Sequence, residues 1–193
     1  MGKKVIIISG SPKRDGNTVM LVDWLMEGLR SLGCQVELVH AAFLKYKISG
    51  CISCRSCQKL EKYGCVIDDE AKPVLAKMAE ADIIVFATPL YFYGPSAQTK
   101  MIMDRMFSLY KWDNKAGTMR TPLKGKTLAV VVSAYEGEGM ECVEKPFKIT
   151  AEYSGMKFAS LLVPNAGVSG EIEKRVPGAK QSAVEFAKKL ACL

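Results

Sequence analysis

Four cysteines lie within fifteen consecutive residues in the spacing C-x2-C-x2-C-x7-C; they are Cys51, Cys54, Cys57 and Cys65. Thiolates at this spacing could surround one metal centre. Compact C-x2-C-x2-C runs favour an iron–sulfur cluster, because ligands in a tight loop reach neighbouring irons. Zinc sites more often use two separated pairs of ligands. The third interpretation is a redox pair or a set of free thiols.

A polar loop from Ser9 to Thr18 joins a short apolar run to an amphipathic stretch. The loop contains hydroxyl groups, an amide, two cations and free backbone N–H groups. These groups would converge on a helix N-terminus, which is a favourable place for a phosphate. The loop has neither the G-x-G-x-x-G spacing of a dinucleotide-binding fold nor the P-loop pattern G-x-x-x-x-G-K-[ST]. The alternative is a helix capped by Ser or Asn after a polar turn.

Two further loops follow apolar runs. The loop from Thr88 to Ser96 holds three consecutive aromatic residues, Tyr91 to Tyr93. They cannot all point into the core, so they favour packing against a flat ring. The alternative is an aromatic lid on the core or a subunit contact. The loop from Ser133 to Gly139 is rich in glycine, which lets the backbone approach a ligand closely.

Apolar runs and helical periodicities alternate along the chain and position these loops. The predicted strands are Val5–Ser9, Gln35–Val39, Ile83–Thr88, Thr127–Ser133 and Phe158–Val163. The predicted helices are a helix from Leu21 to Leu32 that stops at Gly33, then Ala71–Ala79, Ser96–Tyr110, Met140–Ser154 and Ala179–Leu190. Strands that are apolar on both sides predict an α/β three-layer sandwich with a five-stranded parallel sheet. The flavodoxin-like strand order, 2-1-3-4-5, brings the three loops to one edge of that sheet.

The chain has 193 residues, of which 49% are apolar and 24% are charged, and its net charge is +7. These values predict one globular domain over residues 1–193, with residues 45–69 as a cysteine-rich insertion after the second strand. The cations are scattered and accompany no nucleic-acid motif, so no nucleic-acid partner is expected. The apolar runs are too short to cross a bilayer and no signal-peptide pattern is present, so a cytoplasmic location without membrane contact is expected.

Together the three loops resemble the flavin-binding loops of flavodoxin-like NAD(P)H-dependent FMN reductases, from Lys4 to about Val163. The segments Gly10–Thr18 and Pro89–Gly94 are the most specific parts of this resemblance. It implies an FMN cofactor whose phosphate is held by Ser9, Ser11, Asn17 and Thr18, with Lys13 or Arg14 nearby. It assigns the isoalloxazine ring to Pro89, Leu90, Tyr91, Phe92, Tyr93, Gly94, Ser133, Tyr135 and Gly137.

The segment Lys100–Arg105 is similar to the helix that follows the ring loop in that family. We interpret its charged residues, Lys100, Asp104 and Arg105, as a structural ion network. The pair Asp68-Asp69 predicts the N-terminal cap of the next helix.

The cysteine segment resembles the iron–sulfur flavoproteins, a branch of the same family. The resemblance implies a [4Fe–4S] cluster near the FMN, with Cys51, Cys54, Cys57 and Cys65 as ligands. The implied function is an FMN-dependent oxidoreductase or electron-transfer flavoprotein that relays electrons between FMN and the cluster. Its donor would be NAD(P)H or a ferredoxin-like protein, and no side chain is assigned as a catalytic acid or base.

Two other functions remain open at this stage. One is a plain NAD(P)H-dependent FMN or quinone reductase without a cluster. The other is a non-enzymatic redox sensor that uses the cysteines as a switch. In the resembled family the flavin commonly lies near a subunit contact, so a homodimer or tetramer is expected. The aromatic loop and the segment Phe107–Thr121 are the candidate contacts.

Overall fold

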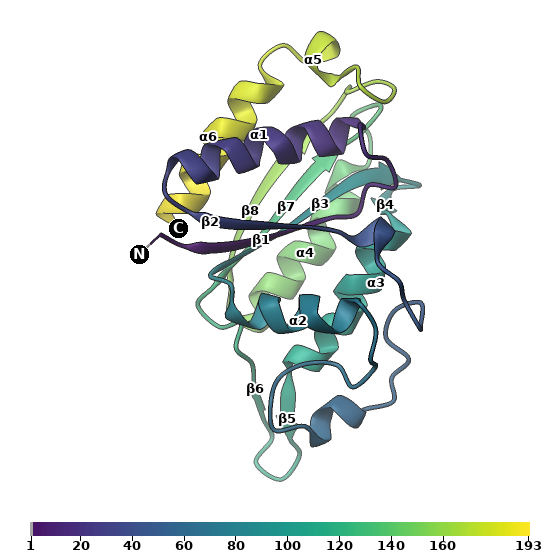
Figure 1. The fold of residues 1–193 in the computed structure, drawn as a ribbon, viewed down its shortest axis with the longest axis vertical. Helices are drawn as coiled ribbons and strands as arrows, with labels where there is room; N and C mark the ends of the chain where they lie inside the picture. Colours follow the sequence, from purple (N-terminus) through teal and green to yellow (C-terminus); the bar gives the residue numbers. More distant parts are fainter. Residues whose placement is uncertain (1) are drawn as a thin grey trace.

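The computed structural model describes residues 2–193, and at its centre is a parallel sheet with helices on both faces (Figure 1). The five principal strands run in the predicted flavodoxin-like order, β2-β1-β3-β7-β8. The strands and α-helices are β1 (Lys4–Ser9), α1 (Asn17–Ser31), β2 (Gln35–His40), α2 (Ala71–Glu80), β3 (Ile83–Tyr91), β4 (Gly94–Pro95), α3 (Ala97–Arg105), β5 (Lys111–Asp113), β6 (Thr118–Arg120), β7 (Thr127–Ser133), α4 (Met140–Ser154), β8 (Lys157–Val163), α5 (Ile172–Arg175) and α6 (Ala179–Cys192). Short 3-10 turns are η1 (Ala41–Phe43), η2 (Ser56–Lys59) and η3 (Met106–Leu109).

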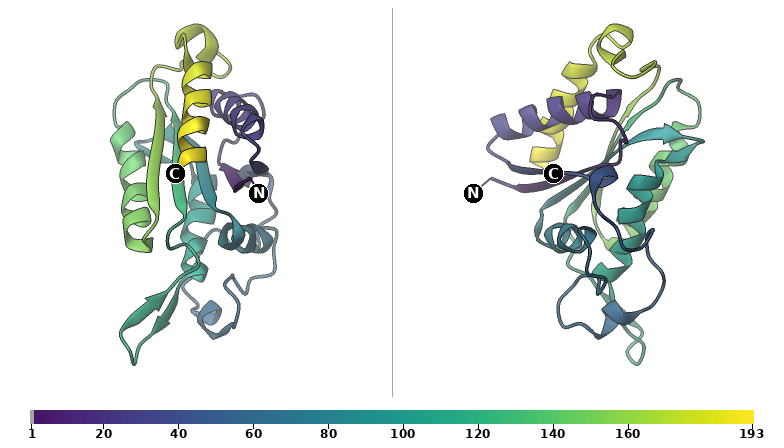
Figure 2. Two further views of the ribbon diagram at one scale, coloured as in Figure 1. Left: turned by 90° about the vertical axis from the view of Figure 1, so that its left-hand side faces the viewer. Right: turned by 45° about the vertical axis from the view of Figure 1, so that its right-hand side comes forward.

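Successive residues of each central strand face opposite helix layers, which explains why these strands are apolar throughout. In β1, Ile7 packs toward α1 and α6, whereas Ile6 and Ile8 pack toward α2, α3 and α4. All three side chains are buried, and the burial of each contributes about 2 kcal/mol to folding. Figure 2 shows these helix layers from two further directions.

The prediction of a five-stranded sheet was wrong by one strand. β3 continues past its predicted end to Tyr91, and the two residues of β4 then pair with it antiparallel. One of these two residues is Pro95, which has no N–H for a strand ladder, so no strand pattern marks the segment. The separate hairpin formed by β5 and β6 was not predicted either.

Helix α1 presents an open first turn to the edge of the sheet. Its N-cap residue is Gly16, which has no side chain, so the first N–H groups are not capped. At the other end Gly33 has a φ of +79°, and its N–H bonds the Arg30 carbonyl at 3.0 Å. The N–H of Cys34 bonds the Leu29 carbonyl at 3.1 Å. These two bonds form a Schellman motif, which confirms the predicted stop at Gly33.

Two predictions about helix ends were wrong. The helix expected from Ser96 to Tyr110 is α-helical only to Arg105, and the 3-10 turn η3 follows it. The pair Asp68-Asp69 does not cap α2, whose N-cap is Glu70 without a side-chain cap bond. Asp69 is instead held by Arg105. Within residues 2–193, no helix has the length and apolar character needed to span a membrane.

Candidate functional site

A cleft opens at the carboxyl edge of the sheet, where the three predicted loops meet. The predicted site residues in its lining are Ser11, Lys13, Asn17, Thr18, Pro89, Leu90, Tyr91, Ser133 and Tyr135. A fourth loop, between β8 and α5, contributes Gly167 and Ser169. This loop was not predicted because it follows an edge strand. Its run of small residues, Asn165 to Gly170, is the signal that could have indicated it.

The other predicted residues, Ser9, Phe92, Tyr93, Gly94 and Gly137, lie outside the cleft lining. Ser9 is fully buried, and its Oγ has no hydrogen-bond partner among residues 2–193. It therefore lies behind the surface of the cleft. The roles of all these residues toward a ligand stay predictions.

Hydroxyl groups join the loops beneath the cleft. Thr18 Oγ1 and Ser133 Oγ are 2.7 Å apart, and they link the first turn of α1 to the end of β7. Ser96 Oγ donates to the Gly10 carbonyl at 2.7 Å. The N-terminus of α3 therefore holds the first loop in place.

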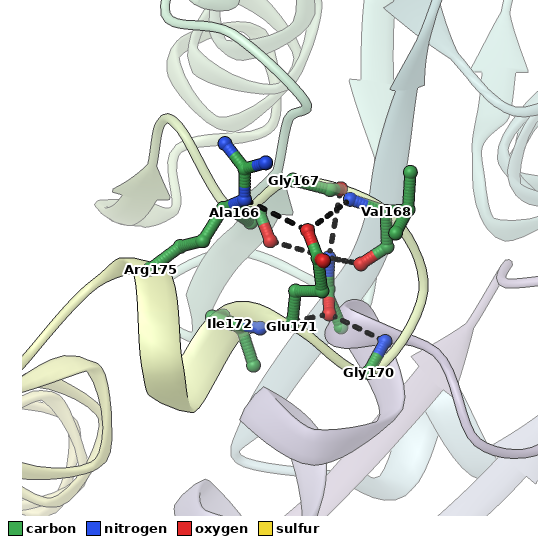
Figure 3. A network of polar contacts seen from close by, with 8 residues as sticks. Ala166, Gly167, Val168, Gly170, Glu171, Ile172 and Arg175 are labelled. Carbon is green, nitrogen blue, oxygen red and sulfur yellow. Dashed lines mark hydrogen bonds and ion pairs between the residues drawn. The ribbon is translucent and has the colours of Figure 1, made fainter.

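Asn17 organises the fourth loop. Its Nδ2 donates to three consecutive carbonyls, those of residues 166–168, at 3.0–3.1 Å. Its Oδ1 accepts the N–H groups of Gly170 and Ile172 at 2.9 and 3.2 Å. Figure 3 shows these loop residues gathered around one centre. The amide is thus fully used within the protein, and it fixes the wall of the cleft.

Glu171 stabilises the same loop, and its carboxylate lies among the labelled residues of the network in Figure 3. It accepts the N–H of Val168 at 3.2 Å, and Arg175 Nε donates to it at 2.7 Å. The hydrogen bond from Arg175 lowers the pKa of the Glu171 carboxyl. A side chain at Gly167, which has a φ of +69°, would collide with Arg175. Both the positive φ and this close contact favour glycine at the position.

The aromatic residues of the second loop form a tight turn that projects from the sheet. Phe92 and Tyr93, between β3 and β4, have positive φ angles of 45° and 61°. This backbone normally selects Asn-Gly, so two aromatic residues here are strained. Phe92 is completely exposed and Tyr91 and Tyr93 are about half exposed. As predicted, the three rings do not all enter the core.

The cleft lining combines two kinds of chemistry. The first loop and α1 contribute an open helical first turn, the exposed Lys13, and Ser11, whose Oγ accepts the Lys13 N–H at 3.2 Å. The end of β3 contributes the apolar surfaces of Leu90 and Tyr91. Donors and positive charge suit a phosphate, and apolar walls suit a flat ring. The residues present therefore fit FMN.

The four cysteines between β2 and α2 line a second, separate pocket. Its remaining lining residues are Ile48, Ile52, Arg55, Val66, Ile67, Arg105, Phe107 and Ser108. Ser53 and Arg55, on either side of Cys54, both have a φ of 56°. These two left-handed residues turn the loop so that all four cysteines border one largely apolar pocket.

The thiols of this pocket differ in environment. Cys51 and Cys54 are exposed, Cys57 is buried, and Cys65 is half-buried. Burial raises the pKa of Cys57, whereas the backbone N–H of Ser56 lowers the pKa of Cys54. Within residues 2–193, no three His, Cys, Asp or Glu side chains stand in metal-binding geometry. Four soft sulfur donors thus share one pocket without forming a coordination shell, and their chemistry suits an iron–sulfur cluster.

Two polar side chains fasten the cysteine loop to the β5–β6 hairpin. The buried Lys111 donates from Nζ to the carbonyl of Cys57 and to the carbonyl three residues further on, the latter at 2.9 Å. Gln58 Nε2 donates to the Tyr110 carbonyl at 2.8 Å, and its Oε1 accepts the Trp112 N–H at 3.2 Å. The loop is therefore held by chain that lies about fifty residues further along the sequence.

A buried ion pair lies on the inner side of the cysteine pocket. Arg105 Nη1 donates to both carboxylate oxygens of Asp69, at 2.8 and 2.9 Å, and neither side chain is more than 1% exposed. Burial acts to raise the pKa of Asp69 and to lower that of Arg105. The pairing outweighs burial, so the pKa of Asp69 is lowered and that of Arg105 is raised. Lys100 and Asp104 form a separate, exposed pair.

Helix α3 links the two candidate sites. Its N-cap Ser96 bonds the first loop, and its last residue, Arg105, lines the cysteine pocket. At about 1.5 Å per residue, this helix of nine residues is about 14 Å long. The two candidate sites are therefore built on opposite ends of one short element.

Comparison with known sequences identifies the family. The profile of the NADPH-dependent FMN reductase family matches residues 3–167. The chain belongs to this family. An iron–sulfur flavoprotein of Methanocaldococcus jannaschii is 40% identical over 117 residues, which are 59% of this chain and 58% of that protein. An iron–sulfur flavoprotein of Archaeoglobus fulgidus is 32% identical over 136 residues, 70% of this chain and 56% of that protein.

These matches confirm the resemblance to the iron–sulfur flavoprotein branch. This chain matches little more than half the length of these two relatives. Among solved structures, an FMN-dependent NADH-azoreductase of Bacillus anthracis in complex with FMN has a TM-score of 0.70 at 15% identity. That match covers 97% of this chain and 99% of the azoreductase, and it confirms the flavodoxin-like fold.

Proposed function

We propose that this member of the FMN reductase family is an FMN-dependent oxidoreductase that relays electrons between FMN and a [4Fe–4S] cluster. The observation that carries the proposal is the convergence of Cys51, Cys54, Cys57 and Cys65 on one pocket. That pocket lies at one end of α3, whose other end holds the first loop of the cleft. The names of the two archaeal relatives support the same function.

The cleft residues would bind and orient the flavin. The open first turn of α1, with Ser11 and Lys13, would hold the phosphate, while Leu90 and Tyr91 would contact the ring. When bound, FMN would supply hydride uptake from a nicotinamide and release of electrons one at a time. Among the described residues, no carboxylate and no imidazole lines the cleft. A side-chain acid or base is therefore not part of the proposal.

The four cysteine thiolates would ligate the cluster, which exchanges single electrons with its partners. Lys111 and Gln58 would keep the ligand loop in one conformation. The donor would be NAD(P)H or a ferredoxin-like protein. Arg55 and Lys59 border a hollow beside Trp112, next to the cysteine pocket. Their positive charge would favour an acidic electron carrier at this surface.

We also propose that the protein is a homodimer or tetramer. The fully exposed Phe92 and the hairpin residue Trp112, which stacks on Phe107 at 4.8 Å, are the candidate contact residues. Size-exclusion chromatography with light scattering should give two or four times the chain mass. A single-chain mass at all concentrations would contradict this assembly.

The decisive experiment is an absorption spectrum of protein purified without oxygen, with flavin, iron, sulfide and zinc assayed on the same sample. The proposal expects flavin bands, a broad visible shoulder and about four irons per chain. Cys57→Ser should lose the iron, whereas Cys142→Ser, an exposed cysteine outside the pocket, should keep it. A sample that contains flavin but no iron would favour a plain FMN or quinone reductase. The cysteine side chains favour this alternative in one respect, because among the described residues they do not stand in metal-binding geometry.

A further inference from the structure

One of the three nitrogens of the Arg105 guanidinium has no hydrogen-bond partner among the described residues. Nη1 is occupied by Asp69, and Nη2 lies 3.5 Å from the carbonyl oxygen of Ile67. Nε is buried and has no hydrogen-bond partner among residues 2–193. Buried N–H donors are nearly always satisfied, by protein groups or by something bound. We therefore expect a group bound in the cysteine pocket to accept a hydrogen bond from this N–H.

The surroundings of Nε indicate which acceptor this is. Arg105 and Cys65 both line the cysteine pocket. Cys65 lies two residues before Ile67, whose carbonyl oxygen is near Nη2, and no hydrogen bond joins the Cys65 sulfur to Nε among residues 2–193. The carboxylate of Asp69 is itself fixed by the Lys47 N–H at 3.1 Å. The guanidinium is thus held in one orientation at the wall of the pocket that Cys65 also lines.

We propose that Arg105 is a positioning residue for the four-cysteine centre. With its guanidinium anchored by Asp69, it donates its Nε–H to a sulfur on the Cys65 side of the pocket. This inference rests on the proposed function, in which the four cysteines hold an iron–sulfur cluster. A hydrogen bond and a positive charge at a ligand sulfur stabilise the reduced centre, which carries more negative charge. Arg105 therefore raises the reduction potential of the centre and exchanges no proton or electron itself.

Arg105→Lys is the most discriminating variant. Lysine keeps the positive charge and can still pair with Asp69, but it has no Nε–H in the plane of a guanidinium. The double variant Arg105→Met with Asp69→Leu removes both charges together, because apolar replacement of a whole buried pair generally preserves folding. Lys100→Met is the matched control, since Lys100 is an exposed cation on the same helix.

The parent and the three variants are compared as full chains purified without oxygen. The measurements are iron content, the midpoint potential of the cluster, and the resonance Raman Fe–S bands in H2O and in D2O. In Arg105→Lys we expect at least a tenfold smaller equilibrium constant for one-electron reduction, which is about 59 mV more negative. We also expect the D2O shift of the Fe–S bands to decrease. The double variant should behave likewise, and Lys100→Met should match the parent.

The outcomes separate this inference from the function on which it rests. A parent protein without iron would overturn both. A parent with iron, together with an Arg105→Lys variant of unchanged potential and unchanged D2O shift, would overturn the role of Arg105 alone. Loss of iron from Arg105→Lys, with an unchanged circular dichroism spectrum, would support the positioning role.

Discussion

The cleft and the cysteine pocket are assembled in opposite ways. The cleft forms where regular elements end, and its loops are joined to one another by residues such as Asn17 and Thr18. The cysteine pocket is lined mostly by residues 45–69, whose regular structure is limited to a 3-10 turn. Its loop is held from outside, by Arg105 of α3 and Lys111 of β5. The shape of the cleft follows from the fold, whereas the shape of the pocket depends on a few long-range contacts.

This difference has an energetic consequence. Where many helices and strands hold a site in place, one substitution removes only a small part of the free energy that stabilises the site. Where one buried pair supports a loop, removing either partner leaves a charge without compensation. Substitutions around the cysteine pocket should therefore affect stability more than substitutions in the cleft.

The largest effect is expected for Asp69→Ala. It leaves the charge of Arg105 buried without a partner, so the free energy of unfolding should fall by about 3–5 kcal/mol. Asp68→Ala is the matched control, because Asp68 is 84% exposed and pairs with Lys72 at 3.4 Å; it should cost about 1 kcal/mol or less. Urea denaturation measures both variants. Equal losses would show that the buried pair does not account for the difference between the two regions.

The same pair should make stability depend on pH. The pKa of Asp69 is lower in the folded protein than its ordinary value. Its stabilising contribution is therefore complete above an ordinary carboxyl pKa of about 3.9, and it is lost as the pH falls through the lowered value. The difference in unfolding free energy between the parent and Asp69→Ala should shrink below about pH 4. A difference that stays constant from pH 7 to pH 3 would contradict this assignment.

A smaller effect is expected in the cleft for Asn17→Ala. Losing two or more buried hydrogen bonds, at about 1 kcal/mol each, should weaken the fourth loop. If the free energy of these lost hydrogen bonds weakens ligand binding, the affinity for FMN should fall by about tenfold or more. Flavin fluorescence titration measures the change, with Asn114→Ala in the exposed hairpin as control. Asn17→Asp should also bind weakly, since its carboxylate would face the three carbonyls. Parent-like affinity in Asn17→Asp would show that those contacts are dispensable.

The smallest effect is expected for the aromatic turn. Replacing Phe92 by Asn and Tyr93 by Gly should relieve the positive-φ strain and stabilise the protein by about 1 kcal/mol. It should also weaken FMN binding, because the turn would lose its aromatic surface. Thermal unfolding and flavin titration on the same sample test the two effects. A more stable variant with unchanged FMN affinity would indicate that this turn serves a subunit contact.

Patterns within short windows predicted most of the fold, and partners distant in sequence account for most of what was missed. The sheet order and three of the four cleft loops follow from apolar runs and from the polar segments that separate them. Asp69 stands just before a helix, so it looks like a cap, but its partner Arg105 is 36 residues away. The amide of Asn17 binds a loop some 150 residues away. No local pattern indicates either contact.

Helix α3 couples two distant segments of the molecule mechanically. Its first turn is bonded to the loop at Gly10, and its last residue is bonded to Asp69. A helix of nine residues is stiff along its axis, so a shift at one end displaces the other. The backbone amides of this helix should therefore exchange with solvent deuterium as one cooperative unit. A molecule bound in the cleft should slow the exchange of all the amides of α3, including those at the end of the helix that borders the cysteine pocket.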